Sequence, residues 1–149
     1  WNMASLWNLP ILYVVENNYY AMSTSIDTHL AGSIEKRAAA FGISSSELTT
    51  NNVETIYNET TRILSKIERE SAPWVLICNT YRYCGHSKSD DLSYRCSQEE
   101  DKWRKEDPLI LAGKNISSEI VEYIGKEVDK RIEEAIKSAE FSEFQKFPE

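Results

Sequence analysis

The sequence predicts an α/β fold in which helices flank a parallel sheet. Two short apolar runs rich in β-branched residues, 10–16 and 73–81, are typical of strands buried on both faces. Segments of helical periodicity separate and follow these runs, and this alternation indicates an α/β protein. The chain has 149 residues, enough for one domain with a core of its own. We therefore expect one domain over residues 1–149.

Capping signals and periodicity predict the elements of the first half. The apolar residues of 2–7 indicate a short helix, and the polar residues of 17–32 indicate a loop. Ser33 is the expected N-cap of the next helix, and Gly42 is its expected stop. Residues 43–52 are ambiguous, since they could hold a short edge strand.

The second half contains two further helices before the C-terminal one. Apolar residues in 53–70 recur at helical spacing, and the stretch 82–97 is a long polar loop. Ser97 and Glu100 have the spacing of a capping box. We therefore expect one helix to begin there and a short one to begin at Asp107.

A long amphipathic helix is predicted over 117–142. Its apolar stripe consists of Ile120, Ile124, Val128, Ile132, Ala135, Ile136 and Ala139. The tail after Phe141 is expected to be loosely held.

Composition excludes several classes of protein. The net charge of −7 and the pI of about 5 argue against a general nucleic-acid binder. No run approaches the roughly 20 apolar residues of a membrane span, so we expect no membrane partner. The three cysteines lack the spacing of a zinc site or a disulfide framework, which favours a reducing cytoplasm.

The loop after the second predicted strand reads YRYCGHSKSDD and gathers reactive side chains. Arg82 offers a planar guanidinium for phosphate, and His86 can transfer protons near neutral pH. Gly85 allows the backbone to bend beside them. A solvated surface loop is the alternative interpretation.

The loop after the first predicted strand reads ENNYYAM and also allows two interpretations, a cation site or a turn. The side-chain oxygens of Asn17 and Asn18 suit Mg²⁺ when a diphosphate supplies negative charge. An asparagine doublet is also a common turn former, and the doublet alone favours that interpretation.

The two loops together resemble those of one enzyme family. NMASLWNLPILYVVENNYYAMSTS followed by TYRYCGHSKSDDLSYR is similar to the alpha subunit of thiamine-diphosphate-dependent 2-oxo acid dehydrogenases. That family includes pyruvate, branched-chain and acetoin dehydrogenases. The resemblance covers residues 2–108 and implies the back half of a thiamine-diphosphate-binding, transketolase-like domain.

The resemblance assigns expected roles to individual residues. Asn18 matches an asparagine that gives its side-chain oxygen to Mg²⁺, and Tyr20 matches a residue whose backbone carbonyl is the next ligand. Arg82 matches an arginine that reaches the cofactor's phosphates. His86 matches the histidine near the reacting carbon, and Ser87 matches a serine that is a phosphorylation switch in mitochondrial relatives.

The implied reaction is oxidative decarboxylation of a 2-oxo acid, with pyruvate-like substrates first, and acyl transfer to a lipoyl group. The cofactors would be thiamine diphosphate and Mg²⁺. The expected partners are a beta subunit and a lipoyl-bearing acyltransferase. The expected location is the cytoplasm, or the mitochondrial matrix if the source is eukaryotic.

The chain departs from the family at one important point. The Gly-Asp-Gly motif that supplies an aspartate ligand to Mg²⁺ is missing, which predicts a C-terminal fragment. We therefore expect this chain alone to be inactive and to bind the cofactor weakly or not at all. Uncovered apolar groups also predict self-association, with Trp1, Trp7 and the strand residues 11–15 as the expected exposed groups.

Three alternatives stay open. The chain could be a non-enzymatic α/β binding or interaction module, in which both loops are surface features. It could belong to an acetoin-cleaving enzyme. A transketolase-like or decarboxylase member of the wider thiamine family is the third, although the YRYCGHS segment favours the dehydrogenase branch.

Overall fold

The computed structural model of the protein describes residues 1–144 and divides the chain into two compact units, Trp1–Leu111 and Ala112–Glu149. The first part of the chain holds α1 (Asn2–Leu6), β1 (Leu12–Asn17), β2 (Tyr20–Ala21), β3 (Thr24–Ser25), α2 (Ile26–His29), α3 (Ile34–Ala40) and β4 (Ser44–Leu48). The remainder holds α4 (Val53–Glu70), β5 (Trp74–Asn79), α5 (Ser97–Lys105), α6 (Pro108–Gly113) and α7 (Ser118–Phe141).

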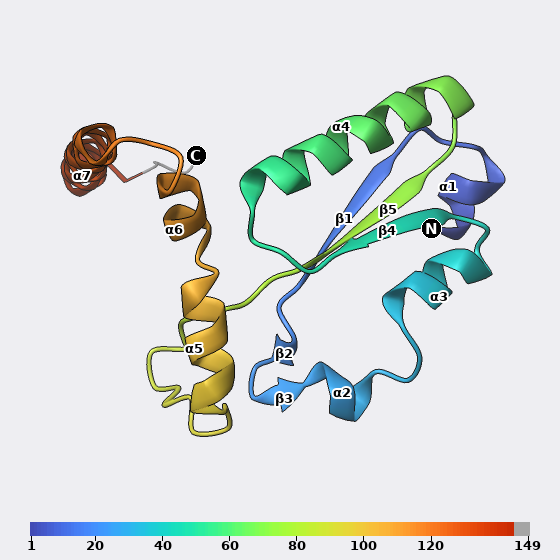
Figure 1. The fold of residues 1–149 in the computed structure, drawn as a ribbon, viewed down its shortest axis with the longest axis horizontal. Helices are drawn as coiled ribbons and strands as arrows, with labels where there is room; N and C mark the ends of the chain where they lie inside the picture. Colours follow the sequence, from blue (N-terminus) through green and yellow to red (C-terminus); the bar gives the residue numbers. More distant parts are fainter. Residues whose placement is uncertain (145–149) are drawn as a thin grey trace, which may run out of the picture. The chain divides into compact units, whose positions relative to one another are not determined.

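A three-stranded parallel sheet forms the centre of the first unit (Figure 1). The strand order is β1, β5, β4, so the last strand of the sequence lies in the middle. The structure thus confirms the α/β fold and both predicted strands, and it resolves the ambiguity of 43–52 in favour of an edge strand.

Side chains of β5 alternate between two apolar layers. Val75 and Ile77 pack with Ala38 of α3 on one face of the sheet. The neighbouring residues of β5 point to the opposite face, where they pack against Ile63 and Ile67 of α4. Alternation follows from the two-residue period of a strand, and helices on both faces explain why β5 is apolar throughout.

The segment 17–32 contains more structure than a loop. β2 and β3, with two residues each, form an antiparallel hairpin, and α2 follows it. The turn between the strands places Met22 at a φ of 54°, a conformation that glycine usually supplies. The prediction of a loop throughout 17–32 was wrong, because no glycine or asparagine marks this turn.

Helix caps agree with the sequence in two places and differ in one. The Ser33 hydroxyl accepts from the Lys36 N–H at 3.1 Å, and Gly42 ends α3 at a φ of 71°. The capping box at Ser97 was wrong, since Ser97 is the first residue of α5 and the N-cap is Cys96, without a side-chain bond.

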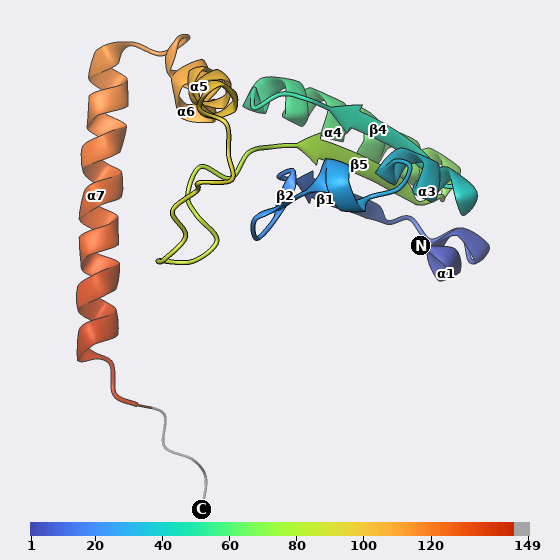
Figure 2. The same ribbon diagram turned by 90° about the horizontal axis from the view of Figure 1, so that it is seen from below.

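The second unit consists mainly of α7, which Figure 2 shows as one uninterrupted helix. Its apolar stripe is about half exposed at every isoleucine, for example 51% at Ile120 and 52% at Ile136. Within residues 1–144, no helix has the length and apolar character needed to cross a bilayer. The expectation for the tail after Phe141 falls partly on 145–149, outside the described residues.

Of the apolar groups that the sequence predicted to be exposed, only Trp7 and Val14 are exposed, whereas Ile11, Leu12, Tyr13 and Val15 are partly buried. Trp7 is 57% exposed, and Val14 of β1 is 56% exposed. Trp1 is instead partly buried, because its ring packs edge-on against the rings of Tyr13 and Phe41 at centroid distances of 6.2 and 6.4 Å. The prediction of an exposed Trp1 was therefore wrong.

Candidate functional site at the carboxyl ends of the strands

The two polar loops leave the sheet at neighbouring positions. Asn17 ends β1 and Asn79 ends β5, and the two residues are register partners in the parallel ladder. The Asn17 side-chain amide donates to Asn79 Oδ1 at 2.8 Å. Ligands of open α/β sheets bind beyond such carboxyl ends, so this edge is the candidate site.

Both asparagines of the doublet form turns with the backbone. Asn17 Oδ1 accepts from the Tyr19 N–H at 3.3 Å, and Asn18 Oδ1 accepts from the Tyr20 N–H at 3.1 Å. Tyr19, which directly follows the doublet, has a φ of 65°. The turn interpretation of the doublet is therefore confirmed. It does not exclude a cation, because a carbonyl oxygen has a second lone pair.

The hairpin leaves the backbone carbonyl of Tyr20 outside its ladder. The Ile26 N–H bonds to the Tyr19 carbonyl at 2.8 Å, so these two residues lie at a hydrogen-bonded position of the ladder, although the Tyr19 N–H donates to Asn17 instead. Bonded and non-bonded pairs alternate along an antiparallel ladder, so Tyr20 and Ser25 are a non-bonded pair. The Tyr20 carbonyl therefore points away from β3 and is available to a ligand.

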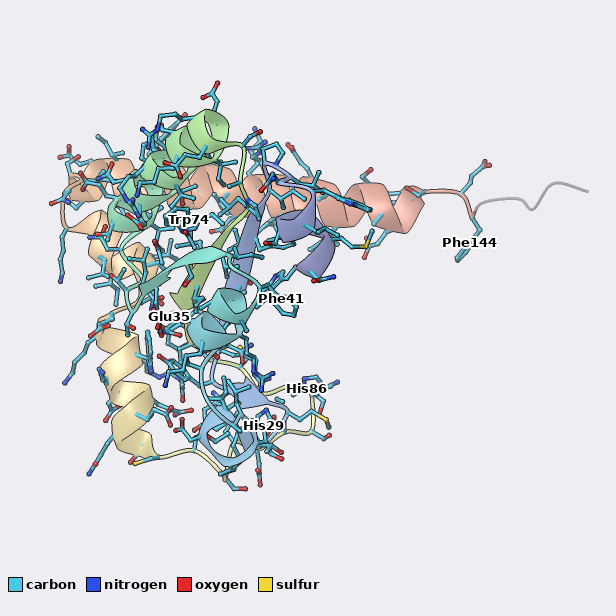
Figure 3. All side chains as sticks on the ribbon, turned by 90° about the vertical axis from the view of Figure 1, so that its right-hand side faces the viewer. His29, Glu35, Phe41, Trp74, His86 and Phe144 are labelled. Carbon is cyan, nitrogen blue, oxygen red and sulfur yellow. The ribbon has the colours of Figure 1, made fainter. Side chains whose placement is uncertain are left out.

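An open hollow of about 180 Å³ lies against this turn. It is lined by residues 16–21 together with Ile26 and His29. No sequence pattern singles out His29. Its Nδ1 lies 2.6 Å from the Ser25 carbonyl and must carry the proton there. His29 and His86, both labelled in Figure 3, lie on the segments that follow β1 and β5.

Arg82 joins the two loops. Its Nη2 donates to the Met22 carbonyl at 2.8 Å and to the Tyr94 hydroxyl at 3.1 Å, and its Nε donates to the Cys84 carbonyl at 3.1 Å. One guanidinium thus holds the hairpin tip and both arms of the second loop. Among the described residues, Nη1 has no hydrogen-bond partner, so two N–H groups stay available to an anion.

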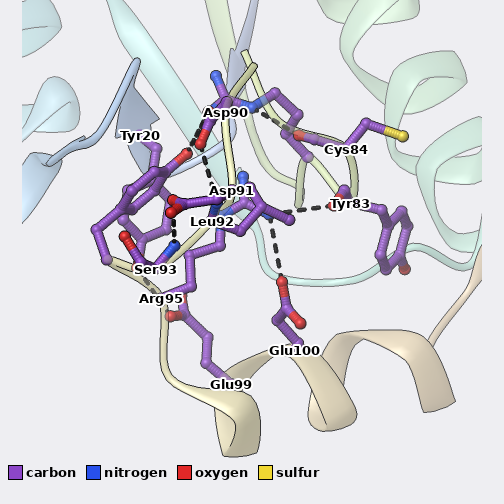
Figure 4. A network of polar contacts seen from close by, with 12 residues as sticks. Tyr20, Tyr83, Cys84, Asp90, Asp91, Leu92, Ser93, Arg95, Glu99 and Glu100 are labelled. Atoms are coloured by element: carbon purple, nitrogen blue, oxygen red, sulfur yellow. Dashed lines mark hydrogen bonds and ion pairs between the residues drawn. The ribbon is translucent and has the colours of Figure 1, made fainter. Parts of the chain in front are cut away.

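Asp90 organises the loop that carries His86 (Figure 4). Its carboxylate accepts from the backbone N–H of His86 at 2.7 Å, from that of Leu92 at 3.0 Å and from the Tyr94 hydroxyl at 2.9 Å. These bonds, the one from His86 first, lower the pKa of Asp90. The side chains of His86 and Ser87 are exposed and face solvent.

A buried arginine lies beneath the loop. Arg95 has 1% of its side chain exposed and stacks within 5.0–5.6 Å of the ring centroids of Tyr20, Tyr81 and Tyr94. Its Nη1 donates to the Tyr83 carbonyl at 3.2 Å. Aromatic faces attract a cation, and this attraction offsets part of the cost of burying the guanidinium.

The oxygens at the turn suit a hard cation that brings its own anion. No group of three histidine, cysteine, aspartate or glutamate side chains within residues 1–144 could hold a metal ion. Asn18 and Tyr20 can offer one neutral oxygen each. Mg²⁺ accepts such oxygens and takes further ones from phosphate and water, so the donor set fits a magnesium diphosphate and does not fit zinc.

Comparison with known proteins identifies the family. The profile of the dehydrogenase E1 component family matches residues 1–147. The chain is 35% identical over 152 residues to the pyruvate dehydrogenase E1 component subunit alpha of Rickettsia conorii, covering 99% of this chain and 47% of that protein. The corresponding protein of Rickettsia prowazekii is 38% identical, with 99% and 46% covered.

A relative with another name matches as well. The alpha subunit of acetoin:2,6-dichlorophenolindophenol oxidoreductase from Cupriavidus necator is 33% identical over 146 residues, covering 93% of this chain and 44% of that protein. The chain spans about half the length of these curated relatives. The match of the family profile along nearly the whole chain shows that this protein belongs to the dehydrogenase E1 component family.

Proposed function

We propose that this chain contributes the magnesium- and diphosphate-binding part of a thiamine-diphosphate-dependent 2-oxo acid dehydrogenase. The observation that carries the proposal is the 2.8 Å hydrogen bond from Arg82 to the Met22 carbonyl. This bond holds Arg82, the candidate for binding phosphate, against the hairpin that follows Asn18 and begins at Tyr20. When bound, the cofactor supplies a thiazolium ring that accepts electrons while the 2-oxo acid loses CO₂.

Each proposed site residue has a separate task. The Asn18 side-chain oxygen and the Tyr20 carbonyl would each take one position around Mg²⁺. Arg82 would offer Nη1 to a phosphate oxygen, with the charge-assisted bond that guanidinium and phosphate form. The exposed imidazole of His86 would take up and return a proton beside the substrate.

The relatives support a pyruvate-like substrate first. The matched proteins of Rickettsia are named pyruvate dehydrogenase subunits, and the relative from Cupriavidus necator, named for acetoin, favours acetoin as the second candidate. A beta subunit would complete the active site, and a lipoyl-bearing acyltransferase would accept the acyl group. We expect this reaction in the cytoplasm, or in the mitochondrial matrix of a eukaryotic source.

Ser87 is the proposed regulatory position. Its hydroxyl is exposed and lies 3.3 Å from that of Ser89, three residues before the Asp90 carboxylate that holds the loop. A phosphate on Ser87 would add negative charge close to this carboxylate and to the diphosphate site. Repulsion would then loosen the loop and weaken cofactor binding.

Titration calorimetry with magnesium thiamine diphosphate tests the proposal. We expect weak, metal-dependent binding, since this chain offers only two oxygens to the cation. Asn18→Ala should abolish it, whereas Asn58→Ala on the exposed face of α4 should not. Equal binding by the Asn18 variant would contradict the proposed site, and decarboxylation by the isolated chain would contradict its proposed dependence on a beta subunit.

A non-enzymatic interaction module remains the competing function. The turn bonds of Asn17 and Asn18 are what such a module would also require. If the chain is such a module, neither the unmodified protein nor the Asn18→Ala variant should bind the cofactor in the calorimetric experiment. The exposed Trp7 and Val14 support self-association under both functions, and a clean monomer in sedimentation at high concentration would argue against it.

A further inference from the structure

A line of three polar side chains crosses the whole sheet at its carboxyl edge. Asn79, only 4% exposed, lies on the central strand between Asn17 of β1 and Glu47 of β4. Its Oδ1 accepts from Asn17 Nδ2 at 2.8 Å, and its Nδ2 donates to Glu47 Oε1 at 2.7 Å. At the other end of the line, Asn17 Oδ1 accepts a hydrogen bond from the Tyr19 N–H. We call these three side chains together with the Tyr19 N–H the amide relay.

Both ends of the amide relay fix its direction. The Glu47 carboxylate can only accept, so Asn79 must turn its NH₂ group toward β4 and its oxygen toward β1. Asn17 must then turn its NH₂ group toward Asn79, which leaves its oxygen for the Tyr19 N–H. All three bonds therefore donate toward Glu47, and hydrogen bonds aligned in one sense strengthen one another.

At the β4 end of the relay, Glu47 alone makes this choice. The Thr49 hydroxyl accepts from the same Asn79 Nδ2 at 3.0 Å, but a hydroxyl can donate as well as accept. With Thr49 alone, either orientation of the Asn79 amide would find a partner. A reversed Asn79 would point its oxygen at the Glu47 carboxylate, which repels it.

We propose that Glu47 is a positioning residue that orients the turn carrying Asn18 and Tyr20 through the amides of Asn79 and Asn17. Glu47 acts at a distance, because two side chains separate it from the turn. The relay itself follows from the contacts above, whereas its effect on a magnesium diphosphate rests on the proposed function. The turn needs such support because Tyr19 adopts a φ of 65°.

A reciprocal exchange of amide and carboxylate tests the relay. Glu47→Gln removes the group that only accepts, so the Tyr19 N–H alone then opposes reversal of the three bonds. Asn79→Asp places two carboxylates face to face. The double variant E47Q/N79D restores one donor against one acceptor, and the new carboxylate at position 79 still accepts from Asn17. Glu68→Gln, on the exposed face of α4, is the matched control.

Hydrogen exchange followed by NMR gives a readout that does not require cofactor. In Glu47→Gln and Asn79→Asp, we expect exchange of the Tyr19 N–H to rise about fivefold or more, the ratio that corresponds to one net hydrogen bond. E47Q/N79D should return within about twofold of the original protein, as should Glu68→Gln. Unchanged exchange in both single variants, or a double variant as fast as the singles, would overturn the proposal.

Calorimetry of the same variants with magnesium thiamine diphosphate separates this inference from the proposed function. If both hold, Glu47→Gln weakens binding about fivefold and E47Q/N79D recovers it. Undiminished binding in a single variant whose Tyr19 exchange has risen would overturn the link from relay to ligand. Failure of the unmodified chain to bind would count against the proposed function, and the exchange data would still decide the relay.

Discussion

The hydroxyl of Tyr20 donates a hydrogen bond of 2.8 Å to the carboxylate of Glu99. The bond connects the hairpin after β1 to the first turn of α5, across 79 residues of sequence. Arg95 stacks on the same tyrosine ring at 5.2 Å. The residue proposed to offer its carbonyl to a cation is therefore held from its side chain by α5 and by the loop that precedes it.

Tyr20→Phe should lower the free energy of unfolding by about 1 kcal/mol, because it removes one hydrogen bond to a partly buried carboxylate. Chemical denaturation measures the change. Tyr57→Phe, on a ring that is 70% exposed, is the control and should change stability little. Equal stability of both variants would show that the bond to Glu99 contributes nothing.

The same bond predicts a pH dependence. Burial, and then the hydrogen bond to Glu99, raises the pKa of Tyr20 from about 10 to about 12. Because the folded pKa is the higher one, this contribution is complete below pH 10 and is lost as the pH rises through 12. Ultraviolet titration should find a late-ionising tyrosine that Tyr20→Phe removes. A titration unaffected by that variant would contradict the assignment.

Gly85→Ala should destabilise the His86 loop by about 1–3 kcal/mol, the usual cost of overpacking. A Cβ at this position would lie 2.7 Å from Asp90 Cβ and 2.9 Å from the Asp90 carbonyl oxygen, so the loop must open. NMR shifts of Asp90 and Leu92 and thermal unfolding report the change.

Gly125→Ala is the matched control for that variant. Gly125 lies inside α7, and a Cβ there would meet nothing within 4 Å. We expect this control to stabilise the helix by about 0.5–1 kcal/mol, because alanine favours a helix interior over glycine. A Gly85 variant that behaves like the Gly125 variant would contradict the packing of the loop.

The ion pair on α4 predicts a loss of stability in acid. Arg62 donates to both oxygens of Glu59 at 2.6 and 2.7 Å, and this bonding lowers the pKa of Glu59 to about 2. The contribution is therefore present above the ordinary pKa of 4.5 and is lost as the pH falls through 2. Glu59→Gln should cost about 0.5 kcal/mol at pH 7 and nothing below pH 2, whereas Glu68→Gln should cost nothing at either pH.

Local patterns predicted the sheet because burial dictates them. The run 73–81 is apolar since helices cover both faces of β5, and the sequence shows this directly. Burial of the run 10–16 on both faces was wrong, because no residue of β1 is buried and Val14 is exposed. The candidate site followed from the same logic, because polar residues directly after two parallel strands meet at one edge. Asn18, Tyr20 and Arg82 as ligands remain predictions.

Features that depend on the order of strands could not be predicted. Glu47 belongs to the site only because β5 lies between β1 and β4, and no sequence spacing relates positions 17, 47 and 79. The hairpin was missed for another reason. Met22 adopts a positive φ, which is unusual for methionine and cannot be predicted from its residue type. The bond from Arg82 to the Met22 carbonyl supports this turn from 60 residues away.

Paramagnetic relaxation with Mn²⁺ tests the central claim most directly. Mn²⁺ accepts the same oxygen ligands as Mg²⁺, and it broadens nearby NMR signals even when binding is weak. With thiamine diphosphate present, we predict selective broadening at Asn18, Tyr20 and Arg82, and its loss in Asn18→Ala. Uniform broadening, or broadening centred on the acidic surface of α7, would contradict a cation site at the carboxyl ends of β1 and β5.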